Sequence, residues 1–314
     1  MNRLLGALLV LFAVSGCALP KQGAFSFAVI GDLQYTAEEE ALFPALIDAM
    51  NRESLAFVVH VGDFKPGSRS VCSDELFRRR HAEFNRSHHP LVYTPGDNEW
   101  VDCRRSTNGS MDPQERLDKL REIFFADEHS LGMRTMPVER PATRYRENAL
   151  WTAGNVVFAT VNIQGSNDNL GFDAANDREH AQRTAQNIAW MQRAAQRAAQ
   201  PGMRALVLFQ QANPGFEVDP DSPRTDGYGE YLAAFEATAQ ALGKPVLFVH
   251  GDSHTYRVEP YRGPASGKQL PMVTRLESVG TPHVDWVRVD VDPDNDAAPF
   301  VIRRGGFVAP AKAH

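Results

Sequence analysis

The amino-acid sequence predicts an α/β fold containing a parallel sheet with crossover helices, and two observations support this. Between residues 25 and 94, apolar runs of strand length alternate with helical segments, which is the rhythm of a parallel sheet. Four apolar runs also end in a Gly-Asp pair, and these pairs contain Asp32, Asp63, Asp97 and Asp252. Ligands bind at the carboxyl edge of such sheets, so we expect the four carboxylates to meet there.

The first part of the chain supplies three strands and two helices. We expect strands at Phe25–Ile30, Ala56–Val61 and Pro90–Thr94, and helices at Ala37–Ser54 and Ser73–Arg86. Between residues 99 and 148 the alternation stops, apart from a helix predicted from Pro113 to Phe125. We interpret this stretch as a loop-rich insertion beside the ligand-binding edge, where selectivity often resides. The alternative is that it only covers the sheet.

Regular structure resumes after residue 148. A strand pair is expected at 149–152 and 156–162, and single strands at 205–209 and 246–249. A long helix from Asn176 to Gln200 is expected to present its Gln and Arg side chains to solvent. From Met272 to Val308, apolar and polar residues alternate as in antiparallel strands. We see no linker, so residues 25–308 are predicted to form a single domain.

The overall composition is that of a globular protein. The chain has 314 residues, of which 43% are hydrophobic and 23% charged, and its formal net charge is −6. A negative chain is poorly suited to bind nucleic acid phosphates without regard to sequence. We therefore expect no nucleic acid partner.

The N-terminus has the features of an export signal. A short positive region precedes an apolar run from Leu4 to Val14, which is too short to span a bilayer comfortably. The following Val14-Ser-Gly-Cys17 resembles a bacterial lipobox. This resemblance implies cleavage before Cys17, a lipid on that cysteine, and a linker over 18–24. Ala18 favours the outer membrane, facing the periplasm. The alternative is an ordinary secretory signal cleaved near Ala18.

Export also bears on the other two cysteines. Cys72 and Cys103 each follow a Gly-Asp strand end, and disulfides persist in an oxidising compartment. We predict a bond between them, worth roughly 3–4 kcal/mol on the loop-entropy model. Two unpaired thiols are the alternative.

The motifs together resemble the calcineurin-like metallophosphoesterases. They are Asp32-x-Gln34, Gly-Asp63, Gly-Asp97-Asn98-Glu99, a polar strand end at Gln210-Gln211, and Gly-Asp252-x-His254, in this order. The resemblance extends from Phe25 to about Ile302. It implies a four-layer α-β-β-α sandwich of two mixed sheets, with a two-metal centre at the strand ends.

The resemblance also implies a role for each motif residue. Asp32 and His254 are expected at the first metal, and Asp63 is expected to bridge both metals. At several positions this chain has an oxygen ligand where the family has a histidine or asparagine. These substituted ligands are Gln34, Asp97, Asp252 and Gln211, with Gln210 as an alternative to Gln211.

The chemistry of these residues favours a hard cation. Four carboxylates buried together would repel one another and take up protons unless cations were present. One imidazole among oxygen ligands suits Mg²⁺, Mn²⁺ or Ca²⁺ better than Zn²⁺ or iron. Two such ions would support hydrolysis of a phosphomonoester or phosphodiester.

Asn98 departs from the family pattern at a position that bears on catalysis. It stands where the family has a histidine that protonates the leaving group or steadies the transition state, and an amide cannot act as an acid. With this departure, the resemblance implies a phosphoester hydrolase with catalytic residues Asn98 and His254. The alternative is a non-catalytic, metal-stabilised binding lipoprotein that retains the fold. Glu99 is expected to hold loop backbone, and His60 and His250 to be buried structural residues.

Overall fold

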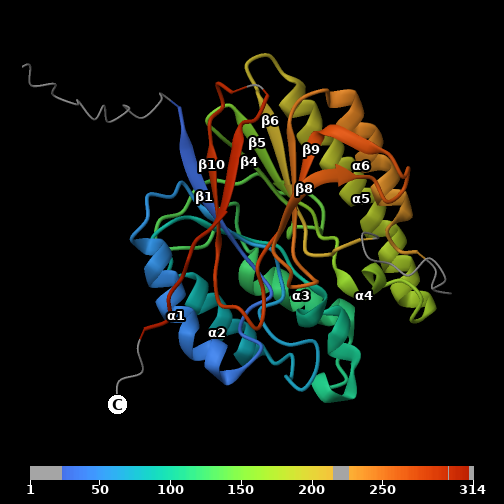
Figure 1. Cartoon of the computed structure of the whole chain (residues 1–314). Helices are drawn as coiled ribbons and strands as arrows, with labels where there is room; N and C mark the ends of the chain where they lie inside the picture. The colour runs from blue at the N-terminus through green and yellow to red at the C-terminus, as the bar shows by residue number, and fades with distance from the viewer. Residues whose placement is uncertain (1–22, 215–225, 296, 311–314) are drawn as a thin grey trace, which may run out of the picture.

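Two mixed β-sheets lie face to face, and helices cover the outer side of each one (Figure 1). This architecture is seen in a computed structural model that describes residues 23–214, 226–295 and 297–310. The layers follow the order helix, sheet, sheet, helix. The predicted four-layer α/β sandwich of two mixed sheets is therefore confirmed.

The first sheet has five strands in the order β11-β10-β1-β2-β3. Its parallel strands are β1 (Phe25–Ile30), β2 (Val58–His60) and β3 (Leu91–Tyr93). The antiparallel strands β10 (Val287–Val291) and β11 (Phe300–Arg304) extend it on the other side of β1. The helices of this layer are α1 (Ala37–Asn51), α2 (Asp74–Phe84) and α3 (Pro113–Phe124).

The second sheet has six strands in the order β4-β5-β6-β7-β9-β8. The strands are β4 (Ala149–Ala153), β5 (Val156–Thr160), β6 (Ala205–Phe209), β7 (Val246–His250), β8 (Arg257–Arg262) and β9 (Gln269–Glu277). Neighbouring strands from β5 to β9 run parallel, and β4 and β8 close the edges antiparallel. The helices of this layer are α5 (Ala174–Ala199) and α6 (Gly229–Leu242).

Alternation along β1 explains how one strand contributes to two cores. Phe27 and Val29 belong to the core between the sheets, whereas Ala28 and Ile30 belong to the core beneath α1, α2 and α3. This follows because successive side chains of a strand point to opposite faces. All four are fully buried. A third core lies between the second sheet and α5 and α6.

The C-terminal strands differ partly from expectation. The chain after Met272 was expected to be antiparallel throughout, but β9 pairs in parallel with β7. Strand β8 was not predicted, because its sequence Arg-Val-Glu-Pro-Tyr-Arg is mostly polar. It lies at the sheet edge, where proline and exposed polar side chains are tolerated.

The predicted disulfide joins the insertion to the loop that follows β2. Cys72 and Cys103 are bonded, with their Cα atoms 5.8 Å apart, and both are fully buried. The buried residues of α3, which include Leu117 and Leu120, lie in the same core as α1 and α2. The insertion therefore packs against the first sheet.

The predicted signal peptide and the lipidation residue Cys17 lie outside the described residues. Among the helices of the described ranges, none combines the length and the apolar character needed to cross a bilayer.

Candidate metal centre

Carboxylates from both sheets meet at one edge of the sandwich. Oxygen atoms of Asp63, Asp97 and Asp252 lie within 4.8 Å of one another. These residues follow β2, β3 and β7, respectively. Asp32, which follows β1, joins the group because its Oδ1 accepts a hydrogen bond of 3.0 Å from the backbone N–H of Asp252. The strand-end acids are therefore brought together as the sequence indicated.

The backbone at this edge is held in an unusual conformation. Five predicted site residues have left-handed φ angles: Asp32 (52°), Gln34 (65°), Asp63 (58°), Asp252 (82°) and His254 (62°). Non-glycine residues adopt this region rarely and at a cost of order 1–3 kcal/mol each. Such strain concentrates at functional sites, where the surrounding fold enforces it.

Asp63 is the best-connected acid of the group. Its Oδ1 accepts a bond from the Asn98 backbone N–H at 3.1 Å. Its Oδ2 accepts bonds from the Tyr35 hydroxyl and from the Gln211 amide nitrogen, both at 3.0 Å. Three segments of the chain, which contain Tyr35, Asn98 and Gln211, thus orient Asp63, the residue expected to bridge two metals.

Gln211 lies at the centre, but its amide oxygen does not face the acids. The oxygen accepts a bond of 2.6 Å from the Gly165 backbone N–H. The amide nitrogen therefore faces the carboxylates, donating to Asp63 and, at 3.2 Å, to Asp252. In this arrangement Gln211 bridges two acids as a donor and offers no ligand oxygen. The alternative, Gln210, donates to the carbonyl of Ala212.

Three buried oxygen atoms of predicted ligands have no hydrogen-bond donor within the described protein. They are Asp32 Oδ2, Gln34 Oε1 and Asp97 Oδ1. A buried polar atom without a partner is costly, and a cation is a suitable partner for an oxygen. The donor set therefore fits hard divalent cations. The amide nitrogen of Gln34, in contrast, donates to Glu83 of α2 at 2.8 Å.

His254 borders the centre on its open side. Its Nε2 lies 3.7 Å from Asp32 Oδ1, and 30% of its side chain is exposed. Burial lowers the pKa of this imidazole below its usual value. The neutral form is thereby favoured, and that form is the metal ligand.

Tyr35 is a site residue that sequence reasoning missed. Its hydroxyl donates to Asp63 and accepts a bond of 2.7 Å from the Asn98 side-chain amide. Its ring and the His254 ring pack in a T-shaped arrangement, with ring centroids 5.2 Å apart. The only signal in the sequence was its position directly after Gln34.

Lys65 is a second missed residue, and it brings a positive charge close to the acids. It is fully buried, and its ammonium group donates to the carbonyls of Asn98 at 2.8 Å and Pro66 at 2.7 Å. Burial lowers the pKa of Lys65 to about 8, against the attraction of nearby carboxylates, of which Glu99 acts most strongly.

Burial dominates the electrostatics of the acids. It raises the pKa of Asp32, Asp63 and Asp97, and it raises that of Asp252 to about 7. Repulsion among the carboxylates adds to the effect for Asp32, Asp63 and Asp252. Divalent cations would remove this penalty by stabilising the ionised forms.

The structural roles expected of three residues are confirmed. Glu99 Oε1 accepts bonds from the backbone N–H groups of Asp63 and Gly96 and from the Tyr93 hydroxyl. His60 and His250 are fully buried, and burial lowers the pKa of each to about 3. They remain neutral at physiological pH and serve as core residues.

The sequence matches no protein-family model and no curated protein. Solved structures do resemble the fold. A dimetal phosphatase from Danio rerio aligns with a TM-score of 0.49 and 14% identity, over 88% of this chain and 98% of the other. A purple acid phosphatase from yellow lupin seeds aligns with a TM-score of 0.49 and 13% identity, over 90% of this chain and 51% of the other.

Phosphopantetheinyl hydrolase from Mycobacterium tuberculosis aligns with a TM-score of 0.45 and 16% identity, over 83% of this chain and 91% of the other. These similarities concern the fold alone. Two mixed sheets between helices, with acids following β1, β2, β3 and β7, are the features that the family resemblance implied. The observed architecture is therefore the one that the resemblance to the calcineurin-like metallophosphoesterases implied.

Proposed function

We propose that this protein is a metal-dependent phosphoester hydrolase with a two-metal centre at the strand ends. The observation that carries the proposal is the meeting of four acids, of which Asp252 is half-buried and the others are buried. Within the described residues, oxygen atoms of Asp32, Gln34 and Asp97 have no hydrogen-bond donor. Asp32, Asp63, Asp97, Asp252 and His254 would hold the ions, with the Gln34 oxygen as a further ligand. Mg²⁺, Mn²⁺ or Ca²⁺ suits this set best.

The bound ions would supply an activated water and stabilise charge at phosphorus. The chain's own residues would orient the ester. The Asn98 amide, which donates one N–H to the Tyr35 hydroxyl beside Asp63, would donate its second N–H to a phosphoryl oxygen. Neither Asn98 nor the neutral His254 supplies a strong acid, so esters with activated leaving groups are the expected substrates.

Chelation and metal add-back test the proposal. The purified protein should hydrolyse an aryl phosphate or a bis-aryl phosphodiester, lose this activity on chelation, and regain it with Mn²⁺ or Mg²⁺. Metal content is measured in parallel by elemental analysis. Turnover that is unaffected by exhaustive removal of metal would refute the metal-dependent mechanism.

A second function is favoured by the orientation of Gln211, whose amide nitrogen occupies a position between Asp63 and Asp252. An internal donor at this point lowers the need for a second cation. In this alternative the protein is a metal-stabilised binding protein without turnover. It predicts that metal raises the melting temperature while a broad phosphoester panel shows no hydrolysis.

The variant Asn98→His separates the two functions. It restores an acid beside the centre, and general acid catalysis typically contributes about 10²–10⁴-fold. For a hydrolase we expect a gain of at least about tenfold on an alkyl phosphate and a smaller gain on an aryl phosphate, measured as kcat. No gain on either ester, with metal bound, would favour the binding protein.

We also propose export and lipid anchoring through Cys17, on the outer membrane facing the periplasm. The support is the apolar run from Leu4 to Val14 followed by the lipobox-like residues. Metabolic labelling with a fatty acid, compared between the wild type and Cys17→Ser, tests this. Equal labelling of the two would contradict it.

A further inference from the structure

One turn of the chain beside the acids has a left-handed backbone over four consecutive residues. It lies in α4 (Gly165–Asp168) and continues to Asn169. The φ angles of Ser166, Asn167, Asp168 and Asn169 are 51°, 56°, 51° and 67°. Residues other than glycine normally adopt the left-handed conformation one at a time, not in succession. A run of four persists only where the surrounding structure enforces it.

The turn faces the candidate metal centre. Ser166 Oγ lies 2.8 Å from Asp97 Oδ2 and 2.7 Å from Asp102 Oδ1. The Gly165 N–H sets the orientation of the Gln211 amide. A side chain at Gly165 would collide with the carboxylates of Asp97 and Asp252, so only glycine allows this approach. The turn therefore orients residues that contact the acids.

Arg183 of α5 binds the turn through hydrogen bonds to Asp168. Its guanidinium donates to Asp168 Oδ1 at 2.8 Å and to the Asp168 carbonyl at 2.9 Å. It also donates to Glu179 at 2.7 Å and to the carbonyl of Asn162 at 2.9 Å. Its charged carbon lies 5.2 Å from the ring centroid of Trp100, which follows the Asp97–Glu99 segment. The Arg side chains of α5 were expected to face solvent, but Arg183 is fully buried.

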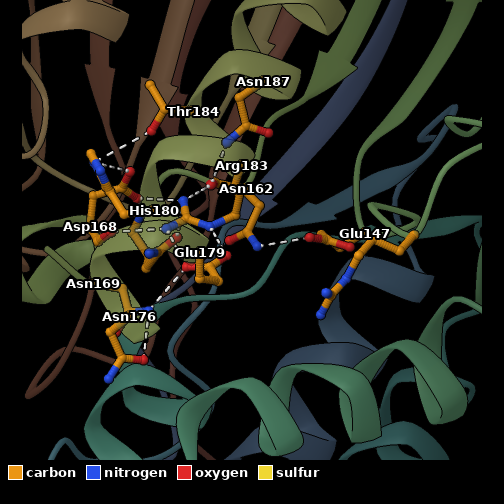
Figure 2. A network of polar contacts seen from close by, with 12 residues as sticks. Glu147, Asn162, Asp168, Asn169, Asn176, Glu179, His180, Arg183, Thr184 and Asn187 are labelled. Carbon is orange, nitrogen blue, oxygen red and sulfur yellow. Dashed lines mark hydrogen bonds and ion pairs between the residues drawn. The ribbon is translucent and has the colours of Figure 1, made fainter. Parts of the chain in front are cut away.

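A wider network completes this support (Figure 2). Glu179 accepts a bond of 3.0 Å from the Asn169 side chain, at the end of the turn. His180 Nε2 lies 3.3 Å from Asp168 Oδ2. Asn187 donates to the Asn162 carbonyl at 2.8 Å. These contacts come from α5 and the loop after β5, and they leave Asp168 and Glu179 paired in the interior.

From this arrangement we propose that Arg183 is a positioning residue of the metal centre. It acts by holding the left-handed turn 166–169, so that the Ser166 hydroxyl orients the Asp97 carboxylate. A planar guanidinium can bind the carboxylate and carbonyl of Asp168 and the carboxylate of Glu179 at once. A lysine in its place keeps the charge but cannot make these contacts together. The inference rests on the proposed metal centre.

Mn²⁺ binding to the purified protein, measured by titration calorimetry, tests the inference by a double-mutant cycle. Residues that orient a metal ligand typically contribute about 10–100-fold to affinity. We expect Ser166→Ala and Arg183→Lys each to weaken Mn²⁺ binding about tenfold or more. Because both act on Asp97, their combination should be little weaker than either alone. Losses that multiply in the double variant would overturn the inference.

Arg193→Lys is the matched control, because Arg193 lies on the same helix with 57% of its side chain exposed. It should leave Mn²⁺ affinity unchanged. Should Arg183→Lys fail to fold, Asp168→Asn replaces it, since Asn tolerates a left-handed backbone; the same tenfold loss is expected. If the folded Arg183→Lys or Asp168→Asn variant binds Mn²⁺ as tightly as the wild type, the inference about Arg183 is overturned while the proposed function stands. A wild-type protein that binds none of Mn²⁺, Mg²⁺ and Ca²⁺ overturns the proposed function as well.

Discussion

Asp63→Asn is expected to reduce phosphoester hydrolysis at least about 10²-fold, since even residues that only orient a metal ligand contribute 10–100-fold to affinity or activity. The loss has two causes. A neutral amide binds cations more weakly than a carboxylate does. Its NH₂ group must also face a hydrogen-bond donor, which disturbs the geometry of the site. Both carboxylate oxygens of Asp63 already accept hydrogen bonds, from Asn98 on one side and from Tyr35 and Gln211 on the other.

Asp63→Asn should affect the stability of the metal-free protein much less than it affects activity. Without metal, relief of repulsion among the clustered acids opposes the cost of turning an NH₂ group toward a donor, so the melting temperature of the metal-free protein should change little. Asp48→Asn is the matched control, because Asp48 is exposed on α1 and is not among the site residues. Activity is measured with an aryl phosphate at saturating Mn²⁺. Equal rates for the wild type and Asp63→Asn would remove the basis for a catalytic metal centre.

The metal-free protein is expected to lose stability as the pH rises from 6.5 to 8. Burial raises the pKa of Asp252 and of Asp102 to about 7. A carboxyl with a raised pKa binds its proton more tightly in the folded state, so its contribution is complete below the unfolded pKa of about 4 and is lost progressively until the pH has passed the raised value. His60 and His250 act oppositely, but only below about pH 6.5, where they are protonated in the unfolded chain.

The size of this change can be estimated from linkage. Each carboxyl that still carries its proton in the folded state contributes up to about 1.4 kcal/mol per pH unit. A decrease in melting temperature on the order of 5 °C follows over this range for a chain of this size. Scanning fluorimetry with a chelator measures it. With Mn²⁺ bound, the decrease should be smaller, because the carboxylates that hold the ion are ionised throughout. A metal-free protein as stable at pH 8 as at pH 6.5 would contradict the prediction.

Many strands and helices and the strand-end acids followed from local patterns, whereas the two-sheet sandwich was implied by the family resemblance. Strand β1 was predicted to the residue, because an apolar run of six residues ends at Gly31. Helix α3 was predicted to within one residue, because Asp112 caps it and Pro113 occupies its first position. The Gly-Asp pairs placed four acids at one edge, since the strands they follow run parallel within each sheet.

Other parts of the site depend on contacts between residues distant in the sequence. Arg183 resembles its exposed neighbours on α5, and only the packing of the helix over the loop after β5 buries it. The amide of Gln211 is oriented by the backbone of Gly165, 46 residues earlier. Asn167, Asp168 and Asn169 are residue types that adopt a left-handed backbone singly, but the local sequence does not indicate four such residues in succession.

The sequence by itself determined which residues reach the edge of the sheets, because strand period and turn chemistry are local properties. The tertiary structure alone decided how these residues face one another. It directed the Gln211 nitrogen toward Asp63 and Asp252 and left one oxygen each of Asp32 and Asp97 without a hydrogen-bond partner in the described part of the chain. Hydrogen bonds between segments far apart in the chain determine these orientations, and they form only when the two sheets pack together.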